Sequence, residues 1–171
     1  MARLTVLTVP DPRLRIKAEP IVQVDDNVRR LMDDLMETMY AEDGAGLAAT
    51  QVGINKRVIV FDLSDTYPNL PPMKMANPEI IWHSKETATE PEGCLSVPDQ
   101  FANVKRSKGV RVRYLDEHNQ PQELEGEDLL AKCLQHEIDH LDGIVYIDHL
   151  STLKRQLIIQ KVQKLKKLLK L

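Results

Sequence analysis

The chain has 171 residues, with 23 basic and 26 acidic side chains and a formal net charge of −3. A chain of this length can bury a core without disulfides. Its two cysteines have no evident partner, the N-terminus lacks an apolar signal segment, and no apolar run approaches the length of a membrane span. These features argue against a disulfide-stabilised secreted protein and an integral membrane protein. We expect one cytoplasmic domain over residues 1–171.

The first predicted element is an amphipathic helix over residues 27–39. Its apolar residues recur at the i, i+3, i+4, i+7 spacing of a helix face that packs on a core. Asp25 or Asp26 can cap its start, and Gly44 lies just past its end. The stripe is expected in the core rather than at a binding surface, and its members are Val28, Leu31, Met32, Leu35, Met36 and Met39.

A glycine-rich segment follows this helix. The pattern Gly44-x-Gly46-x-x-Ala49 has the outline of a dinucleotide-binding fingerprint, which needs a strand before it and a helix after it. Here a helix precedes the glycines and a strand follows within a few residues, so nucleotide binding is excluded. The glycines instead allow the backbone to approach a ligand or another helix, and they place Gln51.

Strands are predicted at residues 57–63 and 110–115, the second with alternating apolar and polar residues. Residues 67–72, with three prolines, predict a loop, and residues 116–121 predict a turn that leads into residues 122–125. Strands and helices do not alternate regularly along the chain. The pattern therefore favours an α+β fold over a doubly wound parallel sheet.

A helix from about residue 127 to residue 141 carries His136-Glu137-Ile138-Asp139-His140, an H-E-x-x-H pattern that Gly143 follows. Imidazoles at i and i+4 lie one above the other on a helix, so both can reach one metal ion. Glu137 projects close by, where its carboxylate can accept a proton from metal-bound water. So short a pattern also arises by chance, as a solvated helix face. One face of this helix would hold Leu129, Cys133, His136 and His140.

Catalytic metal sites usually hold three protein ligands and a water, so the pattern lacks one ligand. Zinc peptidases with this pattern take the third ligand from further along the chain. Here Tyr146 stands where one such group has histidine, and no glutamate follows Glu137. His149 remains a weak downstream candidate.

Upstream, the two cysteines are the other candidates. Cys133 lies seven residues before His140, which is roughly 10 Å of helix, so it is expected to be a small buried thiol. Cys94 lies in residues 91–98, a predicted turn followed by a short extended run. Such a segment can bring a thiolate and a free backbone N–H to a helix from elsewhere in the fold. We assign Cys94, His136 and His140 to one metal ion.

Three segments together resemble the signature motifs of bacterial peptide deformylases, the polypeptide deformylase family. They are residues 44–51 (GAGLAATQ), 92–96 (EGCLS) and 135–140 (QHEIDH), in the family's order and at its usual separations. The likeness covers essentially the whole chain. It implies a single α+β domain with antiparallel sheets around a central metal-binding helix. It also implies an enzyme that removes the formyl group from the N-terminal formylmethionine of newly synthesised proteins.

The resemblance also implies roles for single residues. Glu137 would take a proton from the metal-bound water and pass it to the departing amine. The charge that develops on the formyl oxygen would be stabilised by the metal, the Gln51 side-chain amide and the Leu95 backbone N–H. Asp139 and Asp142 have weaker claims: either could orient a ligand imidazole through its second nitrogen, or simply be solvated.

The implied substrates are N-formylmethionyl nascent peptides. Backbone at Gly44 to Gly46 and at Glu92-Gly93 would bind the peptide as an added strand. Phe101 stands where many relatives carry a polar or basic residue, so contacts beyond the first substrate residue differ here. The pocket for the methionine side chain would be built from Gly46, Leu95, Leu129 and Cys133.

A thiolate and two imidazoles suit Zn²⁺, Fe²⁺, Co²⁺ or Ni²⁺, and the spacing of the ligands does not distinguish these ions. The resemblance implies one Fe²⁺ per chain, which zinc, nickel or cobalt could replace in a purified sample. Two other classes are open alternatives. A small zinc endopeptidase would need a third ligand that is missing downstream, and a structural zinc module would need four protein ligands.

Residues 151–171 carry seven basic residues and no acidic one, which leaves 16 basic and 26 acidic residues in the rest of the chain. Their apolar residues recur at helical spacing, so a basic amphipathic helix is predicted. The resemblance suggests the ribosome near the exit tunnel as its partner, through contacts to RNA phosphates. Simple packing on the body is one alternative. A membrane surface is another, although the usual aromatic anchors are missing. The predicted apolar stripe is Leu153, Leu157, Ile158, Val162, Leu165 and Leu169.

Overall fold

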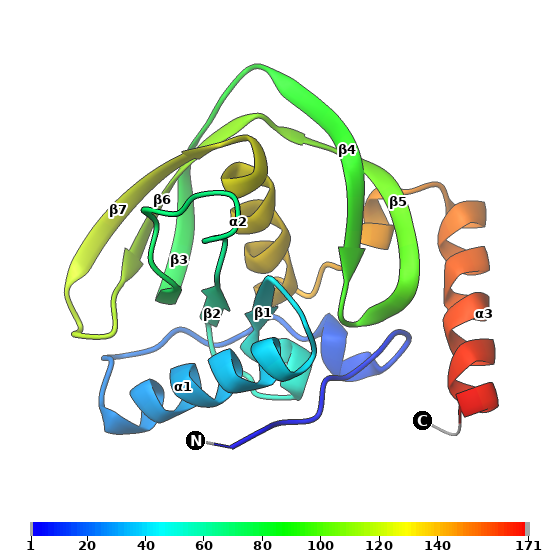
Figure 1. The fold of residues 1–171 in the computed structure, drawn as a ribbon, viewed down its shortest axis with the longest axis horizontal. Coiled ribbons are helices and arrows are strands. Elements are labelled where there is room, and N and C mark those ends of the chain that lie inside the picture. Colours follow the sequence, from blue (N-terminus) through cyan, green and yellow to red (C-terminus); the bar gives the residue numbers. More distant parts are fainter. Residues whose placement is uncertain (1, 170–171) are drawn as a thin grey trace.

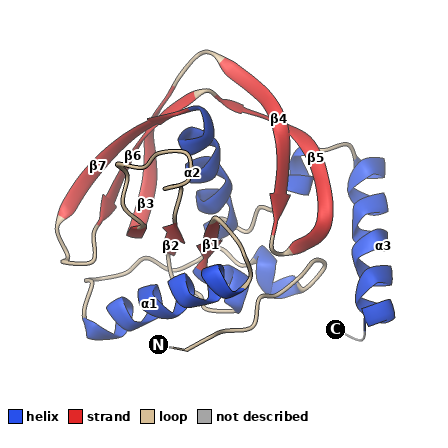
Figure 2. Ribbon diagram, viewed as in Figure 1, coloured by secondary structure: helices blue, strands red, loops and turns tan. Residues whose placement is uncertain are grey.

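Two antiparallel sheets lie on either side of helix α2 in the computed structural model, which describes residues 2–169 (Figures 1 and 2). In chain order the helices and strands are α1 Asp26–Ala41, β1 Gly46–Ala48, β2 Val58–Phe61, β3 Met73–His83, β4 Thr87–Cys94, β5 Val97–Ser107, β6 Gly109–Leu115, β7 Pro121–Glu127, α2 Asp128–Leu141 and α3 Thr152–Leu169. Short 3₁₀ turns lie at Pro12–Arg15, Ala49–Val52 and Tyr146–His149.

The larger sheet has the strand order β1-β2-β3-β6-β7, and the smaller one pairs β4 with β5. Neighbouring strands are antiparallel in both sheets, so the predicted α+β class with antiparallel sheets is confirmed. The predicted strands at 57–63 and 110–115 correspond to β2 and β6, and the predicted turn at 116–121 leads into β7. Strands β1 and β4 each pair with a single neighbour, so each has one open edge.

Helix α2 occupies the space between the sheets because its apolar residues pack on the larger one. Leu134 and Ile138 belong to the same buried cluster as Ile59, Phe61 and Val112. The helix ends as predicted at Gly143, which adopts a left-handed conformation with φ +77°. A Cβ on Gly143 would also lie 2.5 Å from the backbone carbonyl oxygen of Arg15. Both constraints require glycine.

Helix α1 packs its methionine stripe into the core as predicted. Met32, Leu35 and Met39 are fully buried against β1 and β2. The Asp25 side chain caps the helix by accepting a hydrogen bond from the backbone N–H of Val28. The helix therefore fixes the position of the glycine-rich segment that follows it.

The segment around Cys94 differs from its prediction in the order of its parts. Pro91 to Cys94 form the end of strand β4, and the turn comes afterwards, at Leu95-Ser96, before Val97 opens β5. A proline is tolerated in β4 because it is an edge strand. The register of the β4–β5 pair shifts between Glu92 and Cys94, so the ladder is irregular at the residue between them.

Helix α3 forms as predicted, but its apolar residues occupy two faces rather than one. Ile158 and Val162 are buried against β5 and the turn at Tyr146–His149, whereas Leu153 and Leu157 are 70% and 46% exposed. The predicted single stripe was therefore wrong, because the leucines lie about 100° or more around the helix from the packed face. The last two residues of the predicted segment, 170 and 171, lie outside the described residues.

None of the described helices combines the length and apolar character that crossing a membrane requires.

Candidate metal centre

Cys94, His136 and His140 bring their donor atoms together, as the sequence predicted. The Cys94 Sγ lies 3.3 Å from Nε2 of His140, which lies 3.3 Å from Nε2 of His136. Cys133 and His149 do not belong to this group. The third ligand therefore comes from the end of β4, 42 residues before the first histidine of α2.

The donor set fits a divalent ion. Donor atoms 3.3 Å apart are compatible with ligands that lie about 2.0–2.3 Å from a common ion. Burial, followed by the neighbouring His136, lowers the pKa of His140 well below its usual value, so the imidazole is held in the neutral form that ligates metal. Three protein donors are the number found in catalytic rather than structural sites.

A buried ion pair fixes the orientation of His136. Its Nδ1 donates to Oε1 of Glu92 at 2.9 Å, and Arg106 holds both oxygens of Glu92 at 2.8 and 2.9 Å. Burial would raise the pKa of the Glu92 carboxyl, but the Arg106 guanidinium and then His136 hold it at about 2. Glu92 thus stays charged and directs Nε2 of His136 toward the other ligands.

Asp139 and Asp142 do not have the role predicted for them. Asp139 accepts from Arg106 at 2.6 Å and pairs with His149 at 2.9 Å, and Asp142 pairs with Arg57 at 3.0 Å. Neither aspartate reaches a ligand imidazole, because both project toward arginines on other elements. The carboxylate that orients His136 comes instead from the neighbouring sheet.

Two further residues that support the site were not predicted. Arg106 lies on the inward face of β5, in the alternation Ala102, Val104, Arg106, and that alternation was the available signal. Tyr146 is buried, with its ring stacked on His136 at a centroid distance of 6.1 Å. Tyr146 therefore packs against a ligand at a position where some zinc peptidases supply one.

Glu137 is buried beside the three ligands. Its Oε2 lies 4.0 Å from Nε2 of His136, and its Oε1 is buried without a hydrogen-bond partner in the described chain. Burial raises the pKa of Glu137 to about 7. A Cβ on Gly46 would lie 2.6 Å from Oε2 of Glu137, so glycine at that position makes room for the carboxylate.

Gln51 belongs to the first motif, residues 44–51, and Leu95 to the second, residues 92–96. Both residues lie beside the metal ligand Cys94. The Gln51 Nε2 donates to Oγ of Ser96 at 3.0 Å and lies 3.4 Å from Sγ of Cys94. Leu95 occupies the turn after β4, so its backbone N–H lies outside the strand ladder. Its side chain packs directly on Gly44, where a Cβ would be 2.6 Å away. The segments 44–51 and 92–96 therefore pack against each other beside the ligands.

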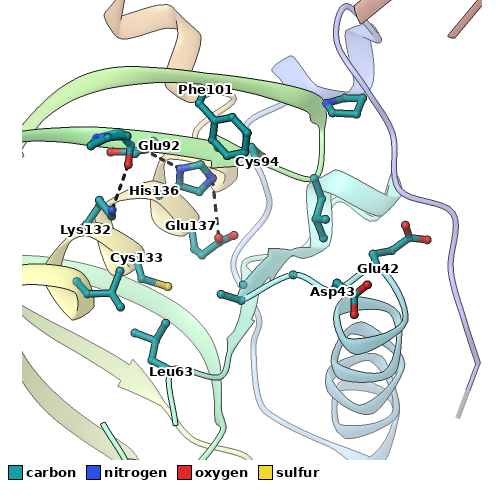
Figure 3. A pocket seen from close by; sticks show the side chains of 18 of the residues that line it. Glu42, Asp43, Leu63, Glu92, Cys94, Phe101, Lys132, Cys133, His136 and Glu137 are labelled. Carbon is teal, nitrogen blue, oxygen red and sulfur yellow. Dashed lines mark hydrogen bonds and ion pairs between the residues drawn. The ribbon is translucent and has the colours of Figure 1, made fainter. Parts of the chain in front are cut away.

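A cavity of about 620 Å³ opens onto this site (Figure 3). Cys94, His136 and Glu137 line it, whereas Gln51 and His140 lie behind its wall. Leu63 also lines the cavity and was not predicted. The residues predicted to bind substrate all line the cavity: Gly44, Gly46, Glu92, Gly93, Leu129 and Cys133.

A thiolate and two imidazoles beside a buried glutamate, at the wall of a cavity, define a metal-dependent hydrolase. The chain matches the sequence model of the family described as polypeptide deformylase over residues 3–156. A peptide deformylase from Methylocella silvestris is 50% identical over 166 residues, which cover 95% of this chain and 85% of that protein. One from Alkalilimnicola ehrlichii is 52% identical, covering 96% of this chain and 92% of that protein.

Solved structures agree with the sequence comparisons. The crystal structure of peptide deformylase from Ehrlichia chaffeensis superposes with a TM-score of 0.95 at 38% identity, covering 99% of this chain and 100% of that chain. A peptide deformylase from Legionella pneumophila gives a TM-score of 0.91 at 41% identity, covering 98% and 97%. The chain belongs to the peptide deformylase family. It is a metal-binding hydrolase of protein biosynthesis with peptide deformylase activity.

Proposed function

We propose that the cavity binds the N-terminal formylmethionine of nascent peptides and that the residues described above carry out its deformylation. The observation that supports this most directly is a three-ligand metal group beside a buried, unpartnered carboxylate at the cavity wall. When bound, the divalent ion supplies an acidified water and polarises the formyl carbonyl. The products are formate and a peptide with a free N-terminal methionine.

Glu137 is proposed as the general base and then the general acid. Its unpartnered Oε1 is free to accept a proton from the attacking water. The same carboxyl then delivers that proton to the departing amine, because an amine leaves poorly unless it is protonated. Glycine at position 46 leaves room for Oε2 of Glu137, because a larger residue would displace that oxygen.

Gln51 and Leu95 are proposed to stabilise the negative charge that grows on the formyl oxygen. One hydrogen of Gln51 Nε2 is donated to Oγ of Ser96 at 3.0 Å, and the other makes a long 3.4 Å contact with Sγ of Cys94. This second hydrogen can be shared with a substrate oxygen close to that ligand. The backbone N–H of Leu95 lies in the turn beside the same ligand. One such donor typically contributes about 3 kcal/mol to the transition state.

The substrate backbone is proposed to bind between β1 and β4. Both strands have an open edge, and these edges carry Gly44 to Gly46 and Glu92-Gly93, which line the cavity. An extended peptide can pair with such edges as an added strand. The methionine side chain would then lie in the apolar part of the cavity, against Leu63, Leu129 and Cys133. Burial raises the pKa of the Cys133 thiol, which keeps this surface uncharged.

Fe²⁺ is the proposed native ion, one per chain. The mixed thiolate and imidazole donor set suits Fe²⁺ as well as Zn²⁺, Ni²⁺ or Co²⁺, and the resemblance to bacterial deformylases favours iron. Elemental analysis of protein purified without oxygen tests this proposal. Zinc alone in such a sample, with full activity, would contradict it.

The outward face of α3 is proposed to bind the ribosome near the exit tunnel, in the cytoplasm where nascent chains emerge. It exposes Leu153 and Leu157, together with lysines that can contact RNA phosphates. Ile158 and Val162 belong to the core, so deleting the helix would unfold part of the body. Charge reversal of the exposed Lys161 and Lys164 is the better test. It should abolish low-salt co-sedimentation with ribosomes and leave dipeptide deformylation intact.

The activity itself is tested by measuring release of a primary amine and of formate from formyl-Met-Ala. The metal-loaded protein should turn over this dipeptide, and a chelator should stop it. Cleavage of an internal bond in an unformylated peptide would instead favour a peptidase.

A further inference from the structure

Phe101 is a large aromatic side chain left in water at the mouth of the catalytic cavity. It lies on β5, lines the cavity and is 74% exposed, more than any other aromatic residue that the structure describes. Figure 3 shows its ring on the opposite side of His136 and Glu137 from Leu63 and Cys133. An exposed ring at this place offers apolar area that a bound peptide can cover.

The ring packs on the backbone of the neighbouring strand. A Cβ on Gly93 would lie 2.5 Å from Cε1 and 2.8 Å from Cδ1 of Phe101, so the ring lies directly against the Gly93 backbone. The adjacent backbone is fixed, because the Tyr146 hydroxyl donates to the carbonyl oxygen of Gln100 at 3.0 Å. The ring therefore presents its exposed area next to Gly93, where the peptide backbone is proposed to bind.

Strand geometry decides which substrate residue meets this ring. Successive side chains of an extended peptide point to opposite faces. If the methionine side chain lies against Leu63 and Cys133, the side chain of the second residue points to the other side, where Phe101 lies. This step rests on the proposed binding of formylmethionine in the cavity.

Acidic residues that line the cavity would also act on the second residue of the substrate. Glu42, Asp43 and Asp99 line the cavity. Glu42 is paired with Arg3 at 2.7 Å, whereas Asp43 and Asp99 have no basic partner within the part of the chain that the structure covers. An acidic second residue would be repelled by these carboxylates.

We propose that Phe101 is a specificity-determining residue that reads the second residue of the formylated peptide. Its ring packs on a large apolar side chain at that position and so favours it over alanine, and acidic side chains are disfavoured. The expected preference in kcat/KM is about tenfold, the lower end of what a single apolar contact provides.

The test compares capped tripeptides, formyl-Met-X-Ala amide with X as Phe, Ala or Glu, and formyl-Met-Ala-Phe amide. The metal-loaded wild type should prefer Phe over Ala at X about tenfold and should cleave the Glu peptide most slowly. Phe101→Ala should bring the Phe/Ala ratio to within about twofold of unity, mainly by lowering the rate on the X = Phe peptide. Trp82→Ala, which removes an exposed aromatic ring on β3 away from the cavity, should change neither value.

A Phe/Ala ratio that survives Phe101→Ala would overturn the proposal. So would an equal loss on all four peptides, which would mean that the ring only supports the fold, or a preference confined to Phe at the third position. Phe101→Leu should retain part of the ratio, because it keeps an apolar side chain. If the metal-loaded wild type cleaves no formylated peptide, the proposed function fails together with this inference. A flat ratio with normal turnover refutes the inference alone.

Discussion

Replacing Gly46 by alanine should disable Glu137 without disturbing the metal ligands. The new Cβ would lie 2.6 Å from Oε2 of Glu137, and ordinary contact begins at 3.4 Å, so the carboxylate must withdraw by roughly 0.8 Å. Helix α2 is packed in the core, so the side chain must move rather than the backbone. A displacement near 1 Å of a catalytic group can cost about 10²-fold in rate.

The assay is kcat/KM on formyl-Met-Ala together with the metal content per chain. Gly46→Ala should lose roughly 10²-fold in rate and keep its metal, because the three closest atoms to the added methyl all belong to Glu137. Gly109→Ala is the matched control, since its Cβ would meet nothing closer than 3.5 Å and should leave the rate within about twofold. Near-normal activity of Gly46→Ala would refute the reasoning, and so would metal loss.

Four further variants test the other parts of the site. Cys94→Ser should strip or greatly weaken metal binding, whereas Cys133→Ser should leave the metal content intact, and elemental analysis separates the two. Glu137→Gln should keep its metal and lose at least ~10²-fold in rate, and a near-normal rate would remove it from the mechanism. Arg106→Met leaves Glu92 buried without its main partner, so chemical denaturation should show a loss of about 3 kcal/mol. Because the pKa of Glu92 is lowered to about 2 from its ordinary 4.5, its stabilising contribution is present at neutral pH and lost as pH falls toward 2. Removal of Arg106 raises the pKa of Glu92, so the variant should lose this contribution and its stability should fall less steeply between about pH 4.5 and 2.

The features that sequence alone predicted are those that depend on local periodicity. The stripe of α1 and the H-E-x-x-H pattern of α2 follow from 3.6 residues per turn, and both helices were found within two residues of the expected bounds. Cys94 was preferred because Cys133 failed on spacing, His149 was only a weak candidate, and the segment around Cys94 could reach the helix from elsewhere in the fold. The three-motif resemblance then supplied the fold and the activity.

The features that sequence did not predict depend on contacts between distant elements. The carboxylate that orients His136 on α2 is that of Glu92, which lies 44 residues away on strand β4. Asp139, which is nearer in sequence, pairs with Arg106 instead. Nothing local distinguishes these partners. The apolar residues of α3 divided between two faces for a similar reason. Spacing shows that leucines recur on a helix, but the packing partner decides which are buried.

Because Cys94 lies at the end of β4, metal binding should also stabilise the folded protein. The ligands belong to two bodies, since β4 is part of the small sheet and the histidines lie on α2, which packs on the large sheet. An ion that binds only the assembled ligands cross-links those bodies. Its binding adds to the free energy of unfolding by mass action, about 2.7 kcal/mol at a free concentration 100 times the Kd. The melting temperature of the protein is therefore a direct readout of how much ion it has retained.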